Sequence, residues 1–335
     1  MIFALPFPSI DPEIVSVTVF GFELALRWYA LAYILGIVLG CWLVLLMLLR
    51  PAVGGGSRPR WLPRAVALLT WILLGVVLGG RLGFVLFFQF EYYSAHPGEI
   101  LQVWQGGMSF HGGFLGVVLA IILFSLKNNV PMVRVGDAVA AVAPIGILFG
   151  RLANFINGEL WGRPTLVPWG VVFPDPAAQL CAERFGEVCA RHPSQIYEAI
   201  LEGLVLGLVL LWGITRRRWL HVPGRAIGVF LLGYGLGRTI VEGFRQADAQ
   251  FITESNPFGH VIRLGQSAEA WGLTMGQVLS LPMVAVGLLV LRADPCEQFH
   301  GAVPDRSGRR LLYHTRPLWG SGGLRDSARD QPDVW

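Results

Sequence analysis

The chain has 335 residues, of which 54% are hydrophobic and only 14% are charged, and its formal net charge is +4. Soluble domains carry roughly 25% charged residues, so this composition excludes an ordinary soluble protein and predicts an integral membrane protein. The basic residues gather in short loops and form no patch interleaved with aromatic side chains, which argues against a nucleic-acid partner.

Seven hydrophobic segments are long enough to cross a bilayer, which takes about 20 apolar residues. In chain order they cover approximately residues 22–49, 66–90, 108–126, 136–157, 195–215, 225–245 and 272–291. The predicted fold class is therefore an all-α membrane protein with seven transmembrane helices. The first thirty residues lack the basic start and the small-residue cleavage site of a signal peptide, so the first segment is expected to remain as a span.

Basic residues are distributed unequally between the loops. They follow the first, third and fifth segments, whereas residues 91–105 contain no Lys or Arg. Because Lys and Arg of short loops stay in the cytoplasm, the N-terminus is predicted outside and the C-terminus inside. Loops 158–191 and 246–271 are then expected to form a small extracytoplasmic cap. Residues 1–292 are expected to form the transmembrane domain, and the polar residues 293–335 a disordered cytoplasmic tail.

Glycines recur at four-residue spacing within the predicted spans. Small residues so spaced let the backbones of two membrane helices approach closely, so a packing role is expected for most of the 42 glycines. The pairs are Gly36 and Gly40, Gly75 and Gly79, Gly112 and Gly116, Gly203 and Gly207, and Gly233 and Gly237.

Three of the predicted spans each contain an arginine, namely Arg81, Arg151 and Arg238. An arginine near the centre of a membrane helix costs about 2.5–3.5 kcal/mol, so these residues require a reason. The predicted topology puts all three in the outer half of the membrane, with Arg238 roughly 10 Å below its outer helix end at about 1.5 Å per residue. A cluster of intramembrane arginines predicts a bound anion.

Other polar residues fall in the same outer layer and come from most of the predicted spans. An anionic lipid headgroup is the simplest ligand for such a layer. Part of the charge is also expected to be structural, because Arg238 and Glu242 are four residues apart on one helix face and can pair. Glu198 and Glu202 can pair with groups across the bundle.

The polar residues belong to five strings, which are MSFHGGFLG (108–116), GRLANFINGELWGR (150–163), RHPSQIYEAILEG (191–203), GRTIVEGFRQADAQF (237–251) and MGQVLSLPM (275–283). In these strings, and in their order between about Trp28 and Leu291, the chain resembles the prolipoprotein diacylglyceryl transferase family. The fourteen-residue string is highly specific. Ala153 and Ala247 stand where a glycine and a proline are expected, but neither change removes a functional side chain.

The resemblance implies a catalytic transmembrane domain in the bacterial inner membrane, with the active site toward the periplasmic side. Such an enzyme transfers the diacylglyceryl group of phosphatidylglycerol to the lipobox cysteine thiol of a preprolipoprotein. A thioether forms and glycerol 1-phosphate leaves, in the first step of lipoprotein maturation. No cofactor, metal ion or nucleic acid is implied; the partners are phosphatidylglycerol, lipobox signal peptides and membrane lipid.

The resemblance also implies roles for particular residues. Phosphate binding falls on Arg151 and Arg238, and Arg81 is a further candidate. The remaining site positions carried over from the family are His111, Asn154, Glu159, Tyr29, Tyr234, Glu242 and Arg245.

Several of these roles stay open at the level of sequence. A free thiol with a pKa near 8.5 is only about 3% thiolate at neutral pH, so a base or a positive field must raise that fraction. His111 can be that base, or it can only hydrogen-bond the lipid. Asn154 and Glu159 can bind glycerol hydroxyls or brace their helix, and Tyr29 can be an aromatic belt residue, as can Tyr234.

Three other classes of protein compete with the transferase interpretation. A transporter or channel would spread polar groups along a path through both leaflets. A phosphatidyl transferase would carry an Asp-rich metal motif, and a scaffold would explain the hydrophobicity alone. Among the cysteines, Cys181 and Cys189 lie in an outer loop and are hypothesised to form a disulfide, whereas Cys41 and Cys296 are expected to be free.

Overall fold

The computed structural model describes residues 4–19, 22–48, 61–87, 89–103, 107–181, 188–247, 251–265, 267 and 270–293. These residues belong to one compact unit, Met1–Ala293. The tail predicted over 293–335 lies, beyond Ala293, outside the described residues.

Each of the seven predicted segments contains a helix. In chain order these are α1 (Trp28–Leu48), α3 (Trp61–Phe87), α5 (Phe110–Asn128), α6 (Met132–Ile156), the continuous α7 (Ser194–Glu198), η6 (Ala199–Val205) and α8 (Leu206–Arg216), then α9 (Arg225–Val241) and α10 (Met275–Arg292). Among the described residues, five helical stretches are long and apolar enough to cross a membrane. They are Trp28–Met47, Val66–Leu86, Met132–Ile156, Ser194–Arg216 and Met275–Arg292, and Gly112–Asn128 is a shorter apolar helix. The chain is therefore mostly helical and has the character of a multi-pass membrane protein.

Short elements connect the long helices. The helical ones are α4 (Phe90–Ala95), η2 (Pro97–Leu101), η4 (Pro176–Gln179) and η7 (Trp219–His221). The strands are β1 (Leu5–Pro6), β2 (Glu13–Val19), β3 (Phe22–Arg27), β4 (Val171–Val172), β5 (His260–Arg263) and β6 (Gly272–Thr274). They pair as parallel β1–β4 and as the antiparallel pairs β2–β3 and β5–β6.

The predicted limits of five spans were wrong by three residues or more. Helix α3 begins at Trp61 and α6 at Met132, five and four residues before the predicted limits. Residues 22–27 form β3 instead of helix, and they pair with β2 from Val19↔Phe22 to Glu13↔Arg27. Apolar content alone extended that span, although residues 15–19 alternate branched apolar and polar side chains with the period of a strand. Residues 272–274 likewise form β6, and α9 ends at Val241, four residues before the predicted limit.

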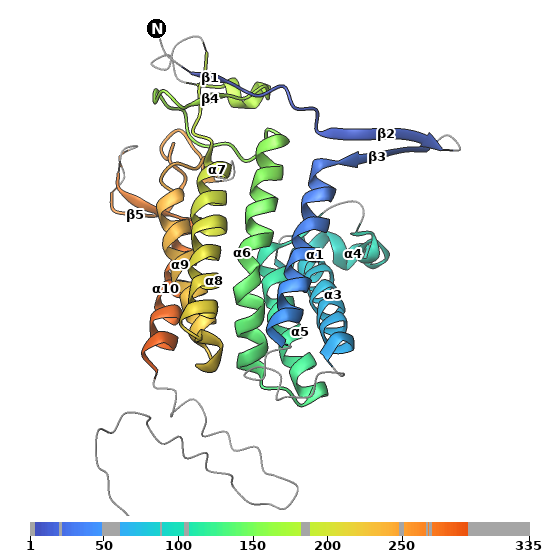
Figure 1. Ribbon diagram of the computed structural model, residues 1–335. Helices are drawn as coiled ribbons and strands as arrows, with labels where there is room; N and C mark the ends of the chain where they lie inside the picture. Colours follow the sequence, from blue (N-terminus) through green and yellow to red (C-terminus); the bar gives the residue numbers. More distant parts are fainter. Residues whose placement is uncertain are drawn as a thin grey trace, which may run out of the picture. The chain divides into compact units, whose positions relative to one another are not determined.

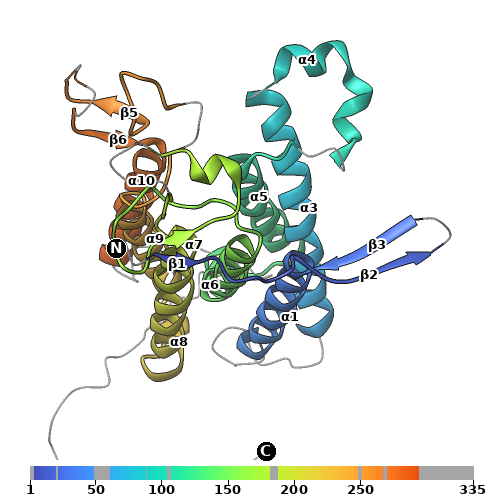
Figure 2. The same ribbon diagram turned by 90° about the horizontal axis from the view of Figure 1, so that it is seen from above.

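Helix α6 lies in the middle of the bundle. It contacts α1 and α5 on one side and α7, η6, α8 and α9 on the other, and Figure 2 shows it between these two groups. Helix α3 packs on α5, and α10 packs on α9. The strands β1 and β4 lie at one end of the bundle, the upper end in Figure 1, where the β2–β3 hairpin extends to the side.

The predicted glycine packing is confirmed between α3 and α5. A Cβ atom on Gly83 would lie 2.6 Å from the Cα atom of Gly112, and one on Gly79 would lie 2.9 Å from the Cα atom of Gly116. The two backbones are thus in direct contact, which only glycine permits here.

Polar groups fix where the helices begin. The Ser109 hydroxyl accepts a hydrogen bond from the Gly112 N–H at 3.2 Å and caps α5. A capping box of Thr274 and Gln277 begins α10. Asp137 of α6 is buried and accepts hydrogen bonds from the N–H groups of Gly224 at 2.7 Å and Ile227 at 2.9 Å, so a side chain of the central helix caps α9.

Candidate active site

Glu198, the last residue of α7, lies between arginines of two other helices. Its Oε2 atom is 2.6 Å from Arg151 Nε of α6, and its Oε1 atom accepts a hydrogen bond from Arg238 Nη1 of α9 at 2.5 Å. Arg245, just beyond α9, brings its Nε atom to 3.9 Å from the same Oε1. Only 2% of Glu198 is exposed. One buried carboxylate therefore gathers three guanidinium groups.

Glu242 supplies a second carboxylate. Its Oε2 atom lies 3.0 Å from Arg238 Nη2, so the predicted pairing of these two residues is confirmed. A Cβ atom on Gly276, at the start of α10, would come within 2.6 Å of the Glu242 carboxyl carbon. Gly276 thus lets α10 close against the carboxylate. The residues Arg151, Glu198, Arg238, Glu242 and Arg245 are called the arginine cluster below.

The cluster lies near one end of the bundle. Arg151 is five residues from the end of α6, and Arg238 is three residues from the end of α9. At about 1.5 Å per residue both lie within about 8 Å of their helix ends. Because Glu198 follows closely after the start of α7, the three residues meet in one layer, as the sequence predicted.

The segment after Glu198 is a π-helix, η6, and it contains Glu202. Glu202 is fully buried, and neither of its carboxylate oxygens has a hydrogen-bond partner among the described residues. The predicted pairing across the bundle is therefore confirmed for Glu198 and wrong for Glu202. The wider turn of a π-helix carries no signal in the sequence that could have predicted this difference.

The signature residues Asn154 and Glu159 bond to each other. Asn154 Nδ2 donates to Glu159 Oε1 at 2.7 Å, and the Glu159 N–H donates to the Asn154 carbonyl at 3.1 Å. Gln195 Nε2 donates to the Glu159 carbonyl at 2.5 Å. These contacts brace the end of α6 against the start of α7, while Glu159 stays exposed.

The end of the 150–163 string forms hydrogen bonds to the residues that follow α9. The Arg163 N–H donates to the Phe244 carbonyl at 2.8 Å, and Arg163 Nε donates to the Arg245 carbonyl at 2.9 Å. The Gly162 N–H donates to the His192 carbonyl at 2.9 Å. Three of the strings that carry the family resemblance thus hold one another by backbone hydrogen bonds around the arginine cluster.

Arg81 has a different environment. Its Nε, Nη1 and Nη2 atoms donate to the carbonyls of Ile100 at 2.8 Å, Gly107 at 3.3 Å and Glu99 at 2.7 Å. Its guanidinium carbon also lies 5.1 Å from the centre of the Tyr93 ring. These contacts make Arg81 the anchor of the segment that follows α4.

The structure gives fewer contacts for the remaining predicted site residues, Tyr29, Tyr234 and His111. The Tyr29 hydroxyl accepts a hydrogen bond from Tyr33 at 3.2 Å. Tyr234 lies one turn before Arg238 on α9 and stacks on Phe230 at 5.8 Å between ring centres. His111 is the second residue of α5, but its side chain lies outside the described part of the chain.

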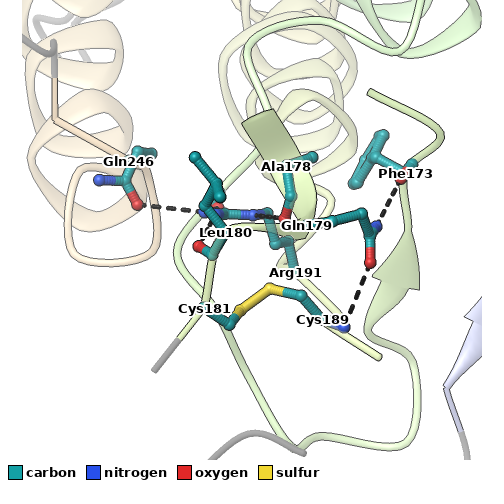
Figure 3. Close-up of a disulfide and its surroundings, with 9 residues drawn as sticks. Phe173, Ala178, Gln179, Leu180, Cys181, Cys189, Arg191 and Gln246 are labelled. Carbon is teal, nitrogen blue, oxygen red and sulfur yellow. Dashed lines mark hydrogen bonds between the residues drawn. A yellow bond between two sulfur atoms is a disulfide. The ribbon is translucent and has the colours of Figure 1, made fainter. Parts of the chain in front are cut away.

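A buried arginine that the sequence did not single out organises the outer loop. Figure 3 shows Arg191 donating to the carbonyls of Ala178 at 2.5 Å and Leu180 at 2.9 Å and to Gln246 Oε1 at 3.3 Å. Burial lowers the pKa of Arg191 to about 10.

The hypothesised disulfide is confirmed beside it. Cys181 and Cys189 are bonded, with their Cα atoms 5.8 Å apart (Figure 3). Gln179 ties the bridge to the rest of the loop, since it donates to the Phe173 carbonyl at 2.6 Å and accepts from the Cys189 N–H at 3.3 Å. Cys41 is free.

An apolar pocket of about 350 Å³ lies between the α7–η6 segment and α9. Its lining includes Tyr197, Ile200, Leu201, Ile240, Val241 and Phe244. Leu201 follows Glu198 by three residues and Val241 follows Arg238 by three, so the pocket adjoins the arginine cluster. His192 closes one side, with its Nδ1 atom 3.1 Å from the Tyr197 hydroxyl, and burial lowers its pKa.

The described residues contain no group of three or more His, Cys, Asp or Glu side chains placed to hold a metal ion. The arrangement instead offers clustered guanidinium groups, which suit a phosphate, next to an apolar pocket, which suits a hydrocarbon chain.

Comparison with known proteins gives a consistent match. Residues 16–293 match the family model for prolipoprotein diacylglyceryl transferase. A phosphatidylglycerol–prolipoprotein diacylglyceryl transferase of Ruegeria pomeroyi is 57% identical over 291 residues, covering 86% of this chain and 97% of the relative. Enzymes of the same name from Rhizobium meliloti and Rhodospirillum rubrum are each 48% identical, over 85% and 88% of this chain and 92% and 97% of their own lengths.

Proposed function

The chain belongs to the prolipoprotein diacylglyceryl transferase family, and we propose that its arginine cluster binds the phosphate of phosphatidylglycerol during the transfer. It is a transferase of lipoprotein biosynthesis, moving the diacylglyceryl group of phosphatidylglycerol to a prolipoprotein. The attacking group is then the thiol of the lipobox cysteine, which displaces the phosphate from a glycerol carbon.

The observation that carries the proposal is that Arg151 and Arg238, from different helices, both contact Glu198. A guanidinium group can offer two parallel N–H donors, and a phosphate has enough oxygens to accept from both arginines at once. The positive groups are already in place, so they stabilise the negative charge that grows on the departing phosphate without rearranging.

The lipid part of the substrate fits the same location. An acyl chain of the bound lipid would enter the pocket between α7–η6 and α9. Ile240 at its border is 57% exposed, as expected of a side chain that faces lipid. The reaction would therefore draw its lipid sideways from the membrane. Together with the uneven loop charges, this supports seven spans in the bacterial inner membrane, with the N-terminus outside and the site in the outer leaflet.

Supporting roles follow for the other residues. Asn154 and Glu159 hold the end of α6 that carries Arg151, and Arg245 adds positive charge to the cluster. Tyr29 and Tyr234 would border the bound headgroup, since Tyr29 is the second residue of α1 and Tyr234 lies one turn before Arg238 on α9. His111 would take the thiol proton, as an imidazole with an ordinary pKa near 6.5 can at neutral pH.

The experiment is transfer from labelled phosphatidylglycerol to a lipobox peptide by the purified protein. Arg151→Ala and Arg238→Ala are each expected to reduce transfer by at least about 100-fold, because a phosphate contact made in the transition state is lost. Arg27→Ala, which removes an exposed arginine paired with Glu13, is the matched control and should retain activity. A peptide with Cys→Ser should accept no lipid.

Two results would contradict the proposal. The first is full activity of both cluster variants, which would remove the cluster from the reaction. The second is no transfer by well-folded protein, which would favour a transport or binding role.

A further inference from the structure

Glu202 is a buried carboxylic acid beside the arginine cluster, and the proposed function gives it no task. It is fully buried, and its two oxygens have no hydrogen-bond partner within the described ranges. A polar group withdrawn from water without a partner costs about 1–3 kcal/mol, and an unpaired charge costs more. A ligand that bonds to Glu202 would recover this loss.

The backbone directs Glu202 toward the arginine cluster. Glu198 and Glu202 are separated by one turn of the same helical segment, whose second part is the π-helix η6. On α9, a Cβ atom at Gly237 would lie 3.2 Å from Glu202 Cγ, so Arg238 follows directly after the point of contact. The charged and titratable groups within electrostatic reach of Glu202 are Arg151 of α6, Glu198 of α7, Tyr234 and Arg238 of α9, and Arg245.

With lipid bound, the net charge of the site depends on whether Glu202 carries a proton. Three arginines face the paired carboxylates Glu198 and Glu242, which leaves one positive charge. Phosphatidylglycerol is a phosphodiester with one negative charge, so the site is neutral with lipid bound if Glu202 carries a proton. An ionised Glu202 would leave an uncompensated negative charge out of contact with water, which is strongly disfavoured.

Building on the proposed function, we propose that Glu202 is a catalytic acid that donates its proton to the departing phosphate. The thiol sulfur forms a bond to the glycerol carbon while the bond from that carbon to the phosphate oxygen breaks. The electron pair of the broken bond stays on the oxygen, which takes the Glu202 proton, so glycerol 1-phosphate leaves as a monoanion. His111 takes the thiol proton and then passes it to Glu202, which restores the acid, and each turnover therefore balances.

The test compares Glu202→Gln with Glu202→Asp. The glutamine has the size of the acid but no proton to give, whereas the aspartate keeps the acid on a shorter side chain. General acid catalysis is worth about 100- to 10,000-fold, so Glu202→Gln should lower kcat at least about 100-fold, with KM for phosphatidylglycerol changed less than about threefold. Glu202→Asp should keep at least about ten times the activity of Glu202→Gln.

A second lipid substrate, with a different leaving group, distinguishes acid catalysis by Glu202 from a role in positioning other residues. In a diacylglyceryl sulfate the leaving group is a weak base that needs no proton. The rate of Glu202→Gln relative to the wild type should therefore be much closer to one with the sulfate than with phosphatidylglycerol. Glu198→Gln is the matched control and should be impaired with both donors, because it disturbs the arginines themselves.

The outcomes separate this proposal from the proposed function. Three results would overturn the acid role. The first is wild-type activity of Glu202→Gln, and the second is an equal loss of activity in Glu202→Gln and Glu202→Asp. The third is an equal loss of activity of Glu202→Gln with both lipid donors. If the wild type does not accept the sulfate, the comparison of Gln with Asp decides. If Arg151→Ala is inactive while Glu202→Gln is unimpaired, only the acid role fails. If Arg151→Ala and Arg238→Ala are fully active, the phosphate site itself is wrong.

Discussion

The Glu198 carboxylate lies 2.6 Å from the Nε atom of Arg151, and it also accepts a hydrogen bond from Arg238. This contact joins α7 to α6, and the bond to Arg238 adds α9. The pairing therefore has two consequences: it holds three helices together, and it sets the separation of the two arginines that are proposed to bind phosphate.

Replacing Glu198 with Gln should destabilise the protein as well as inactivate it. Removing one partner of a buried ion pair costs about 3–5 kcal/mol, because the other charges remain buried without compensation. Thermal unfolding in detergent would show a clear fall in the midpoint. Glu13→Gln, which breaks the exposed pair with Arg27, should change stability by less than about 1 kcal/mol. Equal effects of the two substitutions would contradict this prediction.

Arg81→Lys should separate anchoring from phosphate binding. Lysine cannot reproduce the fixed fork of donors that Arg81 directs at three carbonyls, so a loss of about 1–3 kcal/mol in stability is expected. The KM for phosphatidylglycerol should change less than about threefold. Arg151→Lys should instead raise KM or lower kcat by at least tenfold. A selective rise in KM for phosphatidylglycerol in Arg81→Lys would contradict this prediction and indicate that Arg81 binds phosphate.

Gly79→Ala should loosen the contact between α3 and α5. The added Cβ would lie 2.9 Å from the Cα atom of Gly116, so the helices must separate, at a cost of about 1–3 kcal/mol. Gly146→Ala is the control, because nothing lies within 4 Å of the Cβ added there. Its stability should be unchanged or slightly raised. The measurement is unfolding in detergent, and a larger loss for Gly146→Ala would refute the packing argument.

The Cys181–Cys189 disulfide should stabilise the outer loop. In the chain-entropy model a loop of this size contributes ~2–3 kcal/mol. Non-reducing peptide mapping should recover the two cysteines in one linked pair. The double variant Cys181→Ser with Cys189→Ser should unfold at a lower temperature, whereas Cys41→Ser, at the free cysteine, should not. Recovery of both as free thiols would exclude the bridge.

His192 should make stability depend on pH. Burial lowers the pKa of His192 below 6.5, so the unfolded chain binds a proton there more readily than the folded protein does. The free energy of unfolding is therefore highest above pH 6.5, where His192 is neutral in both states. It decreases as the pH falls below 6.5, because the unfolded chain then binds the proton first. Unfolding midpoints measured from pH 7.5 to 5 should fall less steeply in His192→Asn than in the wild type. Identical slopes for the wild type and His192→Asn would contradict the prediction.

The sequence by itself determined the membrane character, the approximate positions of the long helices that the structure describes, and the layer in which Arg151, Glu198 and Arg238 meet. These properties follow from composition, span length and helical rise, which depend only on residues close together in the chain. Arg151 and Arg238 could be predicted as site residues because a charged side chain in an apolar helix needs compensation.

Only the tertiary structure decided which charges compensate one another. Glu198 gathers the arginines, Glu202 has no partner among the described residues, and Arg81 bonds to backbone carbonyls, although the sequence presents all of them as charges near helix ends. The β2–β3 hairpin was missed for a related reason, since apolar content outweighed its alternating pattern. Ion pairs form between residues that are distant in the chain and close in space, and the packing of α6 against α7 and α9 sets those distances.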